Sequence, residues 1–249
     1  MDKVYKILVI NPGSTSTKVA YFENEAKVNE RELDHDSEEL KKYAKPLDQL
    51  GMRSAAVLEY LSDLGMGVED LDLIASRGSL GQLGLKAGAY AVDEPLLKAY
   101  RASDGTHPAI LGAVIANELV KANPKIRAYI YDAAGINEGG PMAAVTGLPE
   151  IEDDNGGHTL NQHAVGRMVA ERFGLKYEEA NLIVLHMGGG TSCGAHRGGR
   201  IVNLSKNTFT SIRCGNVPSI PLAKLCYSGK YTYEYLRKLM SSGSGLLGY

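Results

Sequence analysis

The chain has 249 residues, of which 44% are hydrophobic and 22% charged, a composition typical of a soluble globular protein with one large or two smaller domains. Lysine and arginine number 27 against 29 aspartate and glutamate residues, so the net charge is −2 and a general nucleic-acid-binding function is disfavoured. The apolar run around Ile7 to Ile10 is too short for a secretion signal or a membrane span. Three cysteines without CxxC spacing argue against a disulfide framework or a zinc site, and we expect a cytoplasmic protein.

Strand-like and helix-like segments alternate along the chain, which predicts an α/β fold. Two strands near the N-terminus, at 6–10 and 17–22, are expected to form a hairpin. An apolar pattern with helical spacing follows at 47–64, between Pro46 and Gly65. The remaining expected elements, in chain order, are a strand at 71–75, a helix at 108–122, a strand at 128–131, a helix at 159–173 and a strand at 181–185.

The expected helix at 159–173 carries recognisable end signals. Thr159 and Gln162 have the spacing of a capping box at its N-terminus. Gly174 is the glycine expected just past its C-terminus.

One pattern occurs twice in the chain. Residues 4–23 form an apolar strand, a turn rich in glycine, serine and threonine, and a second strand, and residues 181–204 repeat this order. Such a repeat predicts two related domains. The polar segment at 149–157 is the expected boundary, which gives domains at 1–150 and 151–249.

Each repeat contains a turn suited to phosphate. Backbone N–H groups and hydroxyls of such a turn point into a small concavity that suits phosphate oxygens. The first turn, from Asn11 to Lys18, adds an amide able to hold a metal-bound water and a lysine able to reach a phosphate. It is neither a Walker A nor a Rossmann sequence. The second turn runs from Gly188 to Ser192, and the alternative for each is a tight hairpin without a ligand.

The string ILVINPGSTSTK resembles the opening of butyrate kinases, members of the acetate kinase family with the actin-like fold of sugar kinases and Hsp70. The resemblance implies two actin-like (RNase H-like) domains of mixed sheet flanked by helices, the first on the substrate side and the second, incomplete, on the nucleotide side. Further matches follow in the same order over essentially the whole chain: Ser76 to Gly78, Gly105 to Gly112, Gly147 to Ile151, His158 to Gln162, His186 to Gly190, Gly194 to Arg200 and Leu225 to Tyr231.

The resemblance implies transfer of the γ-phosphoryl group of ATP, with Mg²⁺, to a short-chain carboxylate, which yields an acyl phosphate and ADP. Because a carboxylate is already a nucleophile, this chemistry needs alignment and charge neutralisation more than a base. Arginine suits both tasks, since its planar fork meets two oxygens at once. The resemblance also implies a homo-oligomer, and it implies neither a nucleic-acid nor a membrane partner.

By position, the resemblance assigns Arg77 to the substrate carboxylate, with a surface salt bridge as the alternative. Asp132, just after a strand, matches the catalytic aspartate, and its alternative is a helix or turn cap. The first turn is assigned to the ATP phosphates and, at its asparagine, to Mg²⁺ through water: Asn11, Gly13, Ser14, Ser16 and Lys18.

In the second half, His158 matches a histidine that stabilises the transition state, with a helix cap or a satisfied core histidine as the alternative. Arg213 is assigned as a second clamping arginine. His107 and His196 are expected to be structural. The ATP phosphate loop is matched by His186, Gly188, Gly189, Gly190 and Thr191.

Two departures from the family pattern bear on activity. Asn203 replaces an aspartate, and the stretch between it and Arg213 is shorter and lacks glycine and proline, so we expect Arg213 to be displaced. The sequence also ends before the family's adenosine loop. We therefore expect a truncated homologue with weak or absent kinase activity on its own. The alternative function is a non-catalytic domain of the same fold that binds a nucleotide or anion weakly or serves as an interaction scaffold.

Overall fold

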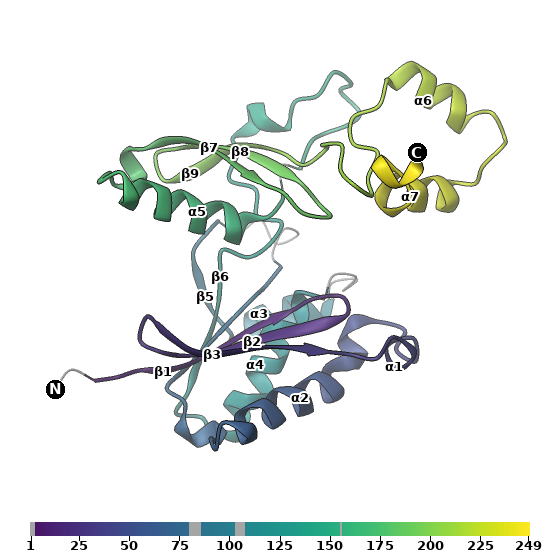
Figure 1. Cartoon of the computed structure of the whole chain (residues 1–249). Helices are drawn as coiled ribbons and strands as arrows, with labels where there is room; N and C mark the ends of the chain where they lie inside the picture. Colours follow the sequence, from purple (N-terminus) through teal and green to yellow (C-terminus); the bar gives the residue numbers. More distant parts are fainter. Residues whose placement is uncertain (1–2, 80–85, 103–107, 155) are drawn as a thin grey trace. The chain divides into compact units, whose positions relative to one another are not determined.

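The computed structural model describes residues 3–79, 86–102, 108–154 and 156–249 (Figure 1). The chain divides into two compact units, Met1–Ala134 and Gly135–Tyr249. This division comes earlier than the boundary expected near residue 150. The reason is that the segment after Gly135 packs on the second unit, where the Glu138 carboxylate accepts hydrogen bonds from the His163 ring and the Ile201 N–H.

The first unit is built on a six-stranded mixed sheet in the order β3-β2-β1-β4-β6-β5. Three consecutive strands form an antiparallel meander, β1 (Lys6–Pro12), β2 (Ser16–Glu23) and β3 (Ala26–Asp34). Next to β1 lies β4 (Leu73–Ser76) and next to β4 lies β6 (Arg127–Tyr131), both parallel to β1. The edge strand β5 (Ala89–Ala91) runs antiparallel to β6.

Helices α2 (Leu50–Asp63) and α4 (Ile110–Ala122) pack against each other and against the sheet (Figure 1). Their apolar side chains and those of the strands form one buried core, which includes Leu8, Ile10, Val57, Tyr60, Leu61, Ile74, Leu111 and Ile115. The other helices of this unit are α1 (Ser37–Leu40), α3 (Glu94–Ala102) and the 3-10 turns η1 (Pro46–Gln49) and η2 (Val68–Asp70).

The second unit contains a three-stranded antiparallel sheet in the order β7-β8-β9, with helix α5 packed against β7 and β9. Its strands are β7 (Asn181–His186), β8 (Ser192–Arg197) and β9 (Arg200–Ser205), and its helices are α5 (Thr159–Arg172), α6 (Ser219–Cys226) and α7 (Tyr233–Ser242). Short 3-10 turns complete it: η4 (Pro141–Ala144), η5 (Tyr177–Glu179) and η6 (Gly245–Gly248).

The expected α/β fold is confirmed, and each strand and helix expected from the sequence has a counterpart in the structure. The expected repeat is also present, because β1-β2-β3 and β7-β8-β9 are both three-stranded antiparallel meanders with a polar turn after the first strand. Strand β3 was not expected, because its side chains are polar and mostly exposed and show no alternation of apolar residues. Within the described residues, no helix is both long and apolar enough to span a membrane.

The expected capping box at the start of α5 is wrong. The N-cap residue is His158, one position earlier, and no side chain caps the helix there. Thr159 is fully buried as the first helical residue, and Gln162 turns inward to bond Ser192. At the other end the expectation holds, since Gly174 follows the helix with a φ of 67°, in the left-handed region that glycine adopts without strain.

Helix α4 approaches the end of β4 so closely that Gly112 is required. A Cβ built at Gly112 would lie 2.2 Å from the Arg77 carbonyl oxygen and 2.6 Å from Ser76 Oγ. Both neighbouring atoms belong to the strand end, and a backbone oxygen cannot rotate away as a flexible side chain can.

We expect Gly112→Ala to destabilise the protein by about 1–3 kcal/mol, because overpacking outweighs the gain in helix propensity. Gly51→Ala is the matched control, since Gly51 also lies in the first turn of a helix and has no neighbour within 4 Å of its built Cβ. This control is expected to be neutral or to add up to about 1 kcal/mol. Urea denaturation of both variants measures the difference, and equal midpoints would contradict the close-approach argument.

Candidate functional site

Three of the residues singled out in the sequence meet at one edge of the first sheet. Asn11 is near the carboxyl end of β1, Arg77 follows β4, and Asp132 follows β6. These strands are adjacent and parallel, and their register pairs Ile10 with Ser76 and Ser76 with Ile130. The carboxyl ends of neighbouring parallel strands are where α/β proteins place their ligands.

Arg77 is held in place by its backbone and by Asn11. Its N–H donates to the Ile10 carbonyl oxygen at 2.9 Å, and its Nη1 donates to Asn11 Oδ1 at 3.4 Å. Burial lowers the pKa of the Arg77 guanidinium. A partly desolvated arginine bonded to a neutral amide is a strong attractor for an anion, because its charge is only weakly screened by water.

Asp132 lies in a conformation that few residues other than glycine adopt. Its side chain is fully buried, its φ is 40°, and its N–H donates to the Gly88 carbonyl oxygen at 3.0 Å. Aspartate is among the residues that tolerate this region best, at some cost in backbone energy. A strained, buried carboxylate at a strand end is an arrangement found frequently at functional sites.

The first turn is tight and partly closed by β3. The Gly13 N–H donates to the Ser16 carbonyl oxygen at 2.8 Å, which leaves Ser14 exposed at the tip. Ser16 is buried, and its hydroxyl donates to the Glu32 carboxylate at 2.7 Å. Lys18 reaches the same carboxylate, with Nζ 3.4 Å from Oε2. The hydrogen bond from Ser16 and the Lys18 ammonium lower the pKa of Glu32 against a smaller effect of burial, so Glu32 neutralises the lysine assigned to phosphate.

Arg53 donates hydrogen bonds to this turn from the buried face of α2. It was not among the residues singled out in the sequence. Its side chain is fully buried in α2, and its guanidinium donates to the Ser14 and Ser16 carbonyl oxygens at 3.1 and 2.9 Å. It also donates to Thr17 Oγ1 and to Gln49 Oε1, both at 2.9 Å. The signal in the sequence was an arginine on the apolar face of a helix, where the helical period requires a core residue.

In the second unit, His158 and His186 form a stacked pair. Their ring centroids lie 3.8 Å apart with an interplanar angle of 15°. His158 Nδ1 lies 3.0 Å from Ser192 Oγ, and His186 Nδ1 lies 2.9 Å from Asn161 Oδ1. His158 is the N-cap residue of α5, but its ring does not cap the helix backbone. The ring is hydrogen-bonded instead to Ser192, the first residue of β8.

The second turn, between β7 and β8, is anchored through its carbonyl groups. Thr208 and Thr210 donate from their hydroxyls to the Thr191 and Gly189 carbonyl oxygens at 3.1 and 3.2 Å. Gly188 and Gly189 are exposed, and the neighbouring Gly190 is half-buried.

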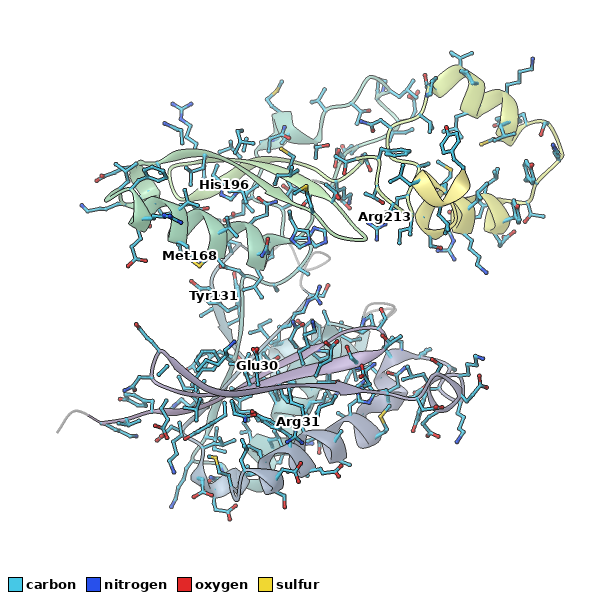
Figure 2. All side chains as sticks on the ribbon, viewed as in Figure 1. Glu30, Arg31, Tyr131, Met168, His196 and Arg213 are labelled. Carbon is cyan, nitrogen blue, oxygen red and sulfur yellow. The ribbon has the colours of Figure 1, made fainter. Side chains whose placement is uncertain are left out.

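Arg213 lies against this turn, beside α7 (Figure 2). A Cβ built at Gly190 would lie 2.8 Å from Arg213 Nη1 and 3.4 Å from His158 Cε1. The Arg213 Nε donates to the Ser241 carbonyl oxygen at 3.3 Å, and its N–H donates to Thr210 Oγ1 at 3.0 Å. The guanidinium and the His158 ring therefore both lie against Gly190, where any larger residue would press on Arg213.

These donors fit a phosphate ligand better than a protein-held metal. A cradle lined by a glycine turn, an arginine and a histidine presents hydrogen-bond donors and positive charge. Among the described residues there is no group of three or more histidine, cysteine, aspartate or glutamate side chains that could hold a metal ion. Mg²⁺ generally needs only one or two protein ligands when water and substrate phosphates supply the rest, so this donor set is compatible with a magnesium–nucleotide complex.

His196, expected to be structural, is buried between the β7–β9 sheet and α5 (Figure 2). Its Nε2 lies 3.0 Å from Gln162 Oε1 and its Nδ1 2.6 Å from the Tyr177 hydroxyl. Burial, and to a smaller extent the charge of His163, lowers the pKa of His196 to about 4, although Glu138 opposes the shift. His107, the other histidine expected to be structural, lies outside the described residues.

We expect Arg53→Met to destabilise the protein by about 3 kcal/mol or more, because several buried oxygens lose a charged donor at once. The matched control is Arg101→Met, since Arg101 pairs with Glu94 on the surface, where both side chains are more than half exposed. Its effect is expected to stay within about 1 kcal/mol. Thermal and urea unfolding measure both, and a small effect at Arg53 would mean that the turn does not need its donor.

The lowered pKa of His196 predicts a loss of stability in acid. An unfolded histidine has a pKa of about 6.5, so between pH 6.5 and 4 the unfolded chain binds more protons than the folded one. This contribution, on the order of 3 kcal/mol, is complete above pH 6.5 and declines as the pH falls towards 4. The control is His196→Gln, which removes the histidine but keeps every carboxylate of the protein. If the unfolding free energies of the two proteins changed with pH in parallel, the prediction would be refuted.

Comparison with known proteins places the chain in a family. No model of a protein family matches it. Butyrate kinase 1 of Clostridium acetobutylicum is 37% identical over 252 residues, which cover 99% of this chain and 70% of that protein. A probable butyrate kinase of Maridesulfovibrio salexigens is 40% identical over 251 residues, which cover 98% of this chain and 68% of that protein.

Solved structures agree with the expected fold. The acetate kinase of Porphyromonas gingivalis matches 98% of this chain and 69% of its own with a TM-score of 0.73 at 19% identity. A propionate kinase of Francisella tularensis matches 98% of this chain and 70% of its own with a TM-score of 0.71 at 16% identity. The actin-like fold implied by the sequence is thereby confirmed, and at 37–40% identity over almost its whole length the chain belongs to the butyrate kinase family.

Proposed function

We propose that the protein phosphorylates a short-chain carboxylate of the butyrate type with ATP. The observation that carries this proposal is the meeting of Asn11, Arg77 and Asp132 at the carboxyl edge of three parallel strands, with Arg77 partly desolvated and bonded to Asn11. The relatives at 37–40% identity are named as butyrate kinases or probable butyrate kinases. Site and relatedness thus favour the same chemistry.

In the first unit, Arg77 binds the substrate carboxylate. A guanidinium donates two parallel hydrogen bonds to a carboxylate, which fixes the direction in which the nucleophilic oxygen points. Asp132 is the catalytic carboxylate, and the strand ends place it on the same edge of the sheet as Arg77. Mg²⁺, when bound with ATP, neutralises phosphate charge, and Asn11 is the residue that would hold it through water.

In the second unit, the turn from His186 to Thr191 binds the phosphates of ATP. Arg213 and His158, which both approach Gly190, neutralise the charge that spreads over the transferred phosphoryl oxygens. In the first unit, the exposed Ser14 at the tip of the first turn offers its hydroxyl to a phosphate oxygen. The Lys18 ammonium forms an exposed ion pair with the Glu32 carboxylate. For Lys18 to bind a phosphate, this ion pair must first open.

The reaction balances without a general base. One carboxylate oxygen of the substrate forms a bond to the γ-phosphorus, and the bond between that phosphorus and the bridging oxygen of ADP breaks. The bond's electron pair leaves with ADP, and no proton is released because the nucleophile is already an anion. What the protein supplies is alignment and positive charge, for which arginine and histidine side chains are suited.

The test combines nucleotide binding with product formation. MgATP is expected to raise the unfolding temperature of the 249-residue chain, since a ligand that binds only the folded state adds stability of RT ln(1 + [L]/Kd). Butyryl phosphate, trapped with hydroxylamine, and ADP are then measured in equal amounts. A thermal shift without product supports the alternative of a non-catalytic nucleotide-binding domain, and neither shift nor product contradicts both.

Arg77→Gln is expected to lower kcat/KM for butyrate by about 100-fold to 1,000-fold, as loss of one charged clamp costs about 3–4 kcal/mol in the transition state. Arg127→Gln is the matched control, because Arg127 is an exposed arginine at the amino end of β6, at the edge of the same sheet opposite to Arg77. Its kinetics are expected to equal those of the unsubstituted chain. An equal loss in both variants would mean that Arg77 has no special place in the reaction.

A further inference from the structure

The interior of the second unit is polar where an apolar core would be the ordinary choice. Between α5 and the sheet lie His163, His196 and Tyr177, which are 1%, 2% and 6% exposed, together with the fully buried Gln162. Buried polar groups of this number are costly unless each is hydrogen-bonded. Here they are, and their bonds form one continuous chain that ends at His158.

The series of hydrogen bonds begins, at its end farthest from His158, with a carboxylate–histidine pair. Glu138 Oε2 lies 2.6 Å from His163 Nε2 and accepts the Ile201 N–H at 3.1 Å. Burial opposes the charge of Glu138, but these hydrogen bonds and the nearby charges of His163 and Arg200 lower its pKa overall. The carboxylate is therefore ionised and accepts the hydrogen of His163 Nε2.

From His163 the chain passes through Tyr177 to His196. The Tyr177 hydroxyl lies 3.0 Å from His163 Nδ1 and 2.6 Å from His196 Nδ1. His196 Nε2 lies 3.0 Å from Gln162 Oε1. The Gln162 amide donates to the carbonyl oxygen and the hydroxyl of Ser192, both at 3.2 Å.

The last step joins the chain to the histidine assigned to catalysis. Ser192 is fully buried, and its Oγ lies 3.0 Å from His158 Nδ1. Seven side chains from Glu138 to His158 thus connect the unit's interior with the cradle at Gly190.

The hydrogens of this chain can be assigned from its heavy atoms in one consistent direction. Gln162 donates from its amide nitrogen to Ser192, so its oxygen accepts from His196 Nε2. A neutral His196 then has a bare Nδ1, which accepts the hydrogen of the Tyr177 hydroxyl. The Tyr177 oxygen in turn accepts from His163 Nδ1, and His163, which also donates to Glu138, carries both hydrogens as an imidazolium.

The same direction continues to His158. Ser192 Oγ accepts from the Gln162 amide, which leaves its own hydrogen available, and His158 Nδ1 lies 3.0 Å away to receive it. A nitrogen that accepts this hydrogen carries none, and a neutral His158 ring then bears its hydrogen on Nε2.

Two glycines make room for this arrangement. A Cβ at Gly166 would lie 2.7 Å from a Tyr177 ring carbon, and a Cβ at Gly194 would lie 2.6 Å from Gln162 Oε1 and 3.0 Å from His196 Nε2. Both glycines therefore serve the close approach of side chains that belong to the chain.

We propose that the buried chain Glu138–His163–Tyr177–His196–Gln162–Ser192 positions His158, fixing Nδ1 as the acceptor and Nε2 as the nitrogen that carries the hydrogen. The members of the chain are positioning residues, since they act through His158. The proposal rests on the proposed function in one respect, namely that His158 contacts the transferred phosphoryl group. A fixed tautomer presents a hydrogen-bond donor to the developing charge without a reorganisation cost at the moment of transfer.

Nitrogen NMR of the histidine rings in the 249-residue chain tests the assignment directly, because bare and hydrogen-bearing ring nitrogens have distinct shifts. Signals are assigned with single histidine-to-glutamine variants. At neutral pH we expect a bare Nδ1 and an Nε2–H for His158 and for His196, and two hydrogen-bearing nitrogens for His163. An Nδ1–H on His158 in the unsubstituted protein would overturn the proposal.

Tyr177→Phe tests whether the chain is coupled, because it removes only the hydroxyl that links His163 and His196. The expected result is loss of the single tautomer at His158, four side chains away, with an unchanged far-ultraviolet circular dichroism spectrum. Tyr60→Phe is the matched control, since Tyr60 is a fully buried tyrosine of the first unit whose hydroxyl donates to the Asn29 carbonyl oxygen. Unchanged His158 signals in Tyr177→Phe would overturn the proposal.

Ser192→Ala provides a second variant in case Tyr177→Phe does not fold, as it deletes only the oxygen that touches His158. It too is expected to release the His158 tautomer. These readouts need no turnover, so a protein with the expected tautomers that forms no acyl phosphate would contradict the proposed function alone. Where turnover is measured, we expect about a tenfold fall in kcat with an unchanged KM for butyrate in Tyr177→Phe.

Discussion

The parallel pairing of β1, β4 and β6 is the constraint on which the first half of the site depends. Parallel strands have their carboxyl ends at one edge, so residues that are far apart in the chain, Asn11, Arg77 and Asp132, become neighbours. The pairing requires α4 to cross closely over β4, and only a glycine at position 112 permits that approach. A methyl group there would push on the carbonyl of Arg77 itself. The close packing of α4 on the sheet therefore also fixes the backbone position of the arginine.

The two units stabilise their glycine-rich turns by different means. In the first unit a single buried cation, Arg53, binds the turn's carbonyl oxygens from the apolar core side. In the second unit, threonine hydroxyls bind the turn's carbonyl oxygens, and polar side chains fill the space under α5. Both arrangements direct hydrogen-bond donors to carbonyl groups.

The order of elements and the repeat could be predicted from the sequence because apolar periodicity and turn residues report them directly. Strand β3 could not, since its polar residues pair through backbone groups that any side chain permits. The capping box was predicted from spacing alone, and the burial of Thr159 and Gln162 against the sheet overrode it. Local spacing describes what a side chain is able to do, and tertiary contacts decide what it does.

The site shows the same division. The residues that follow a strand or lie in a glycine-rich turn could be singled out, because strand ends and such turns are visible in a sequence. The supporting residues could not, since Arg53, Glu138 and Tyr177 act through contacts with segments distant in the chain. One signal was nevertheless present, because a charged residue on the apolar face of a helix needs buried partners.

The polar interior under α5 carries a cost that a purely structural explanation does not recover. Apolar residues of similar size would fill the space without the desolvation of an ion pair, and buried ion pairs frequently stabilise less than such replacements. What the hydrogen-bonded chain provides instead is direction, because Gln162, which donates to the Ser192 carbonyl oxygen, presents its own oxygen to His196 and so orders the donors and acceptors on either side. Direction has value only where the last member must present one particular nitrogen. That last member is His158, at the glycine turn beside Arg213, so the cost is placed where orientation of a single ring matters most.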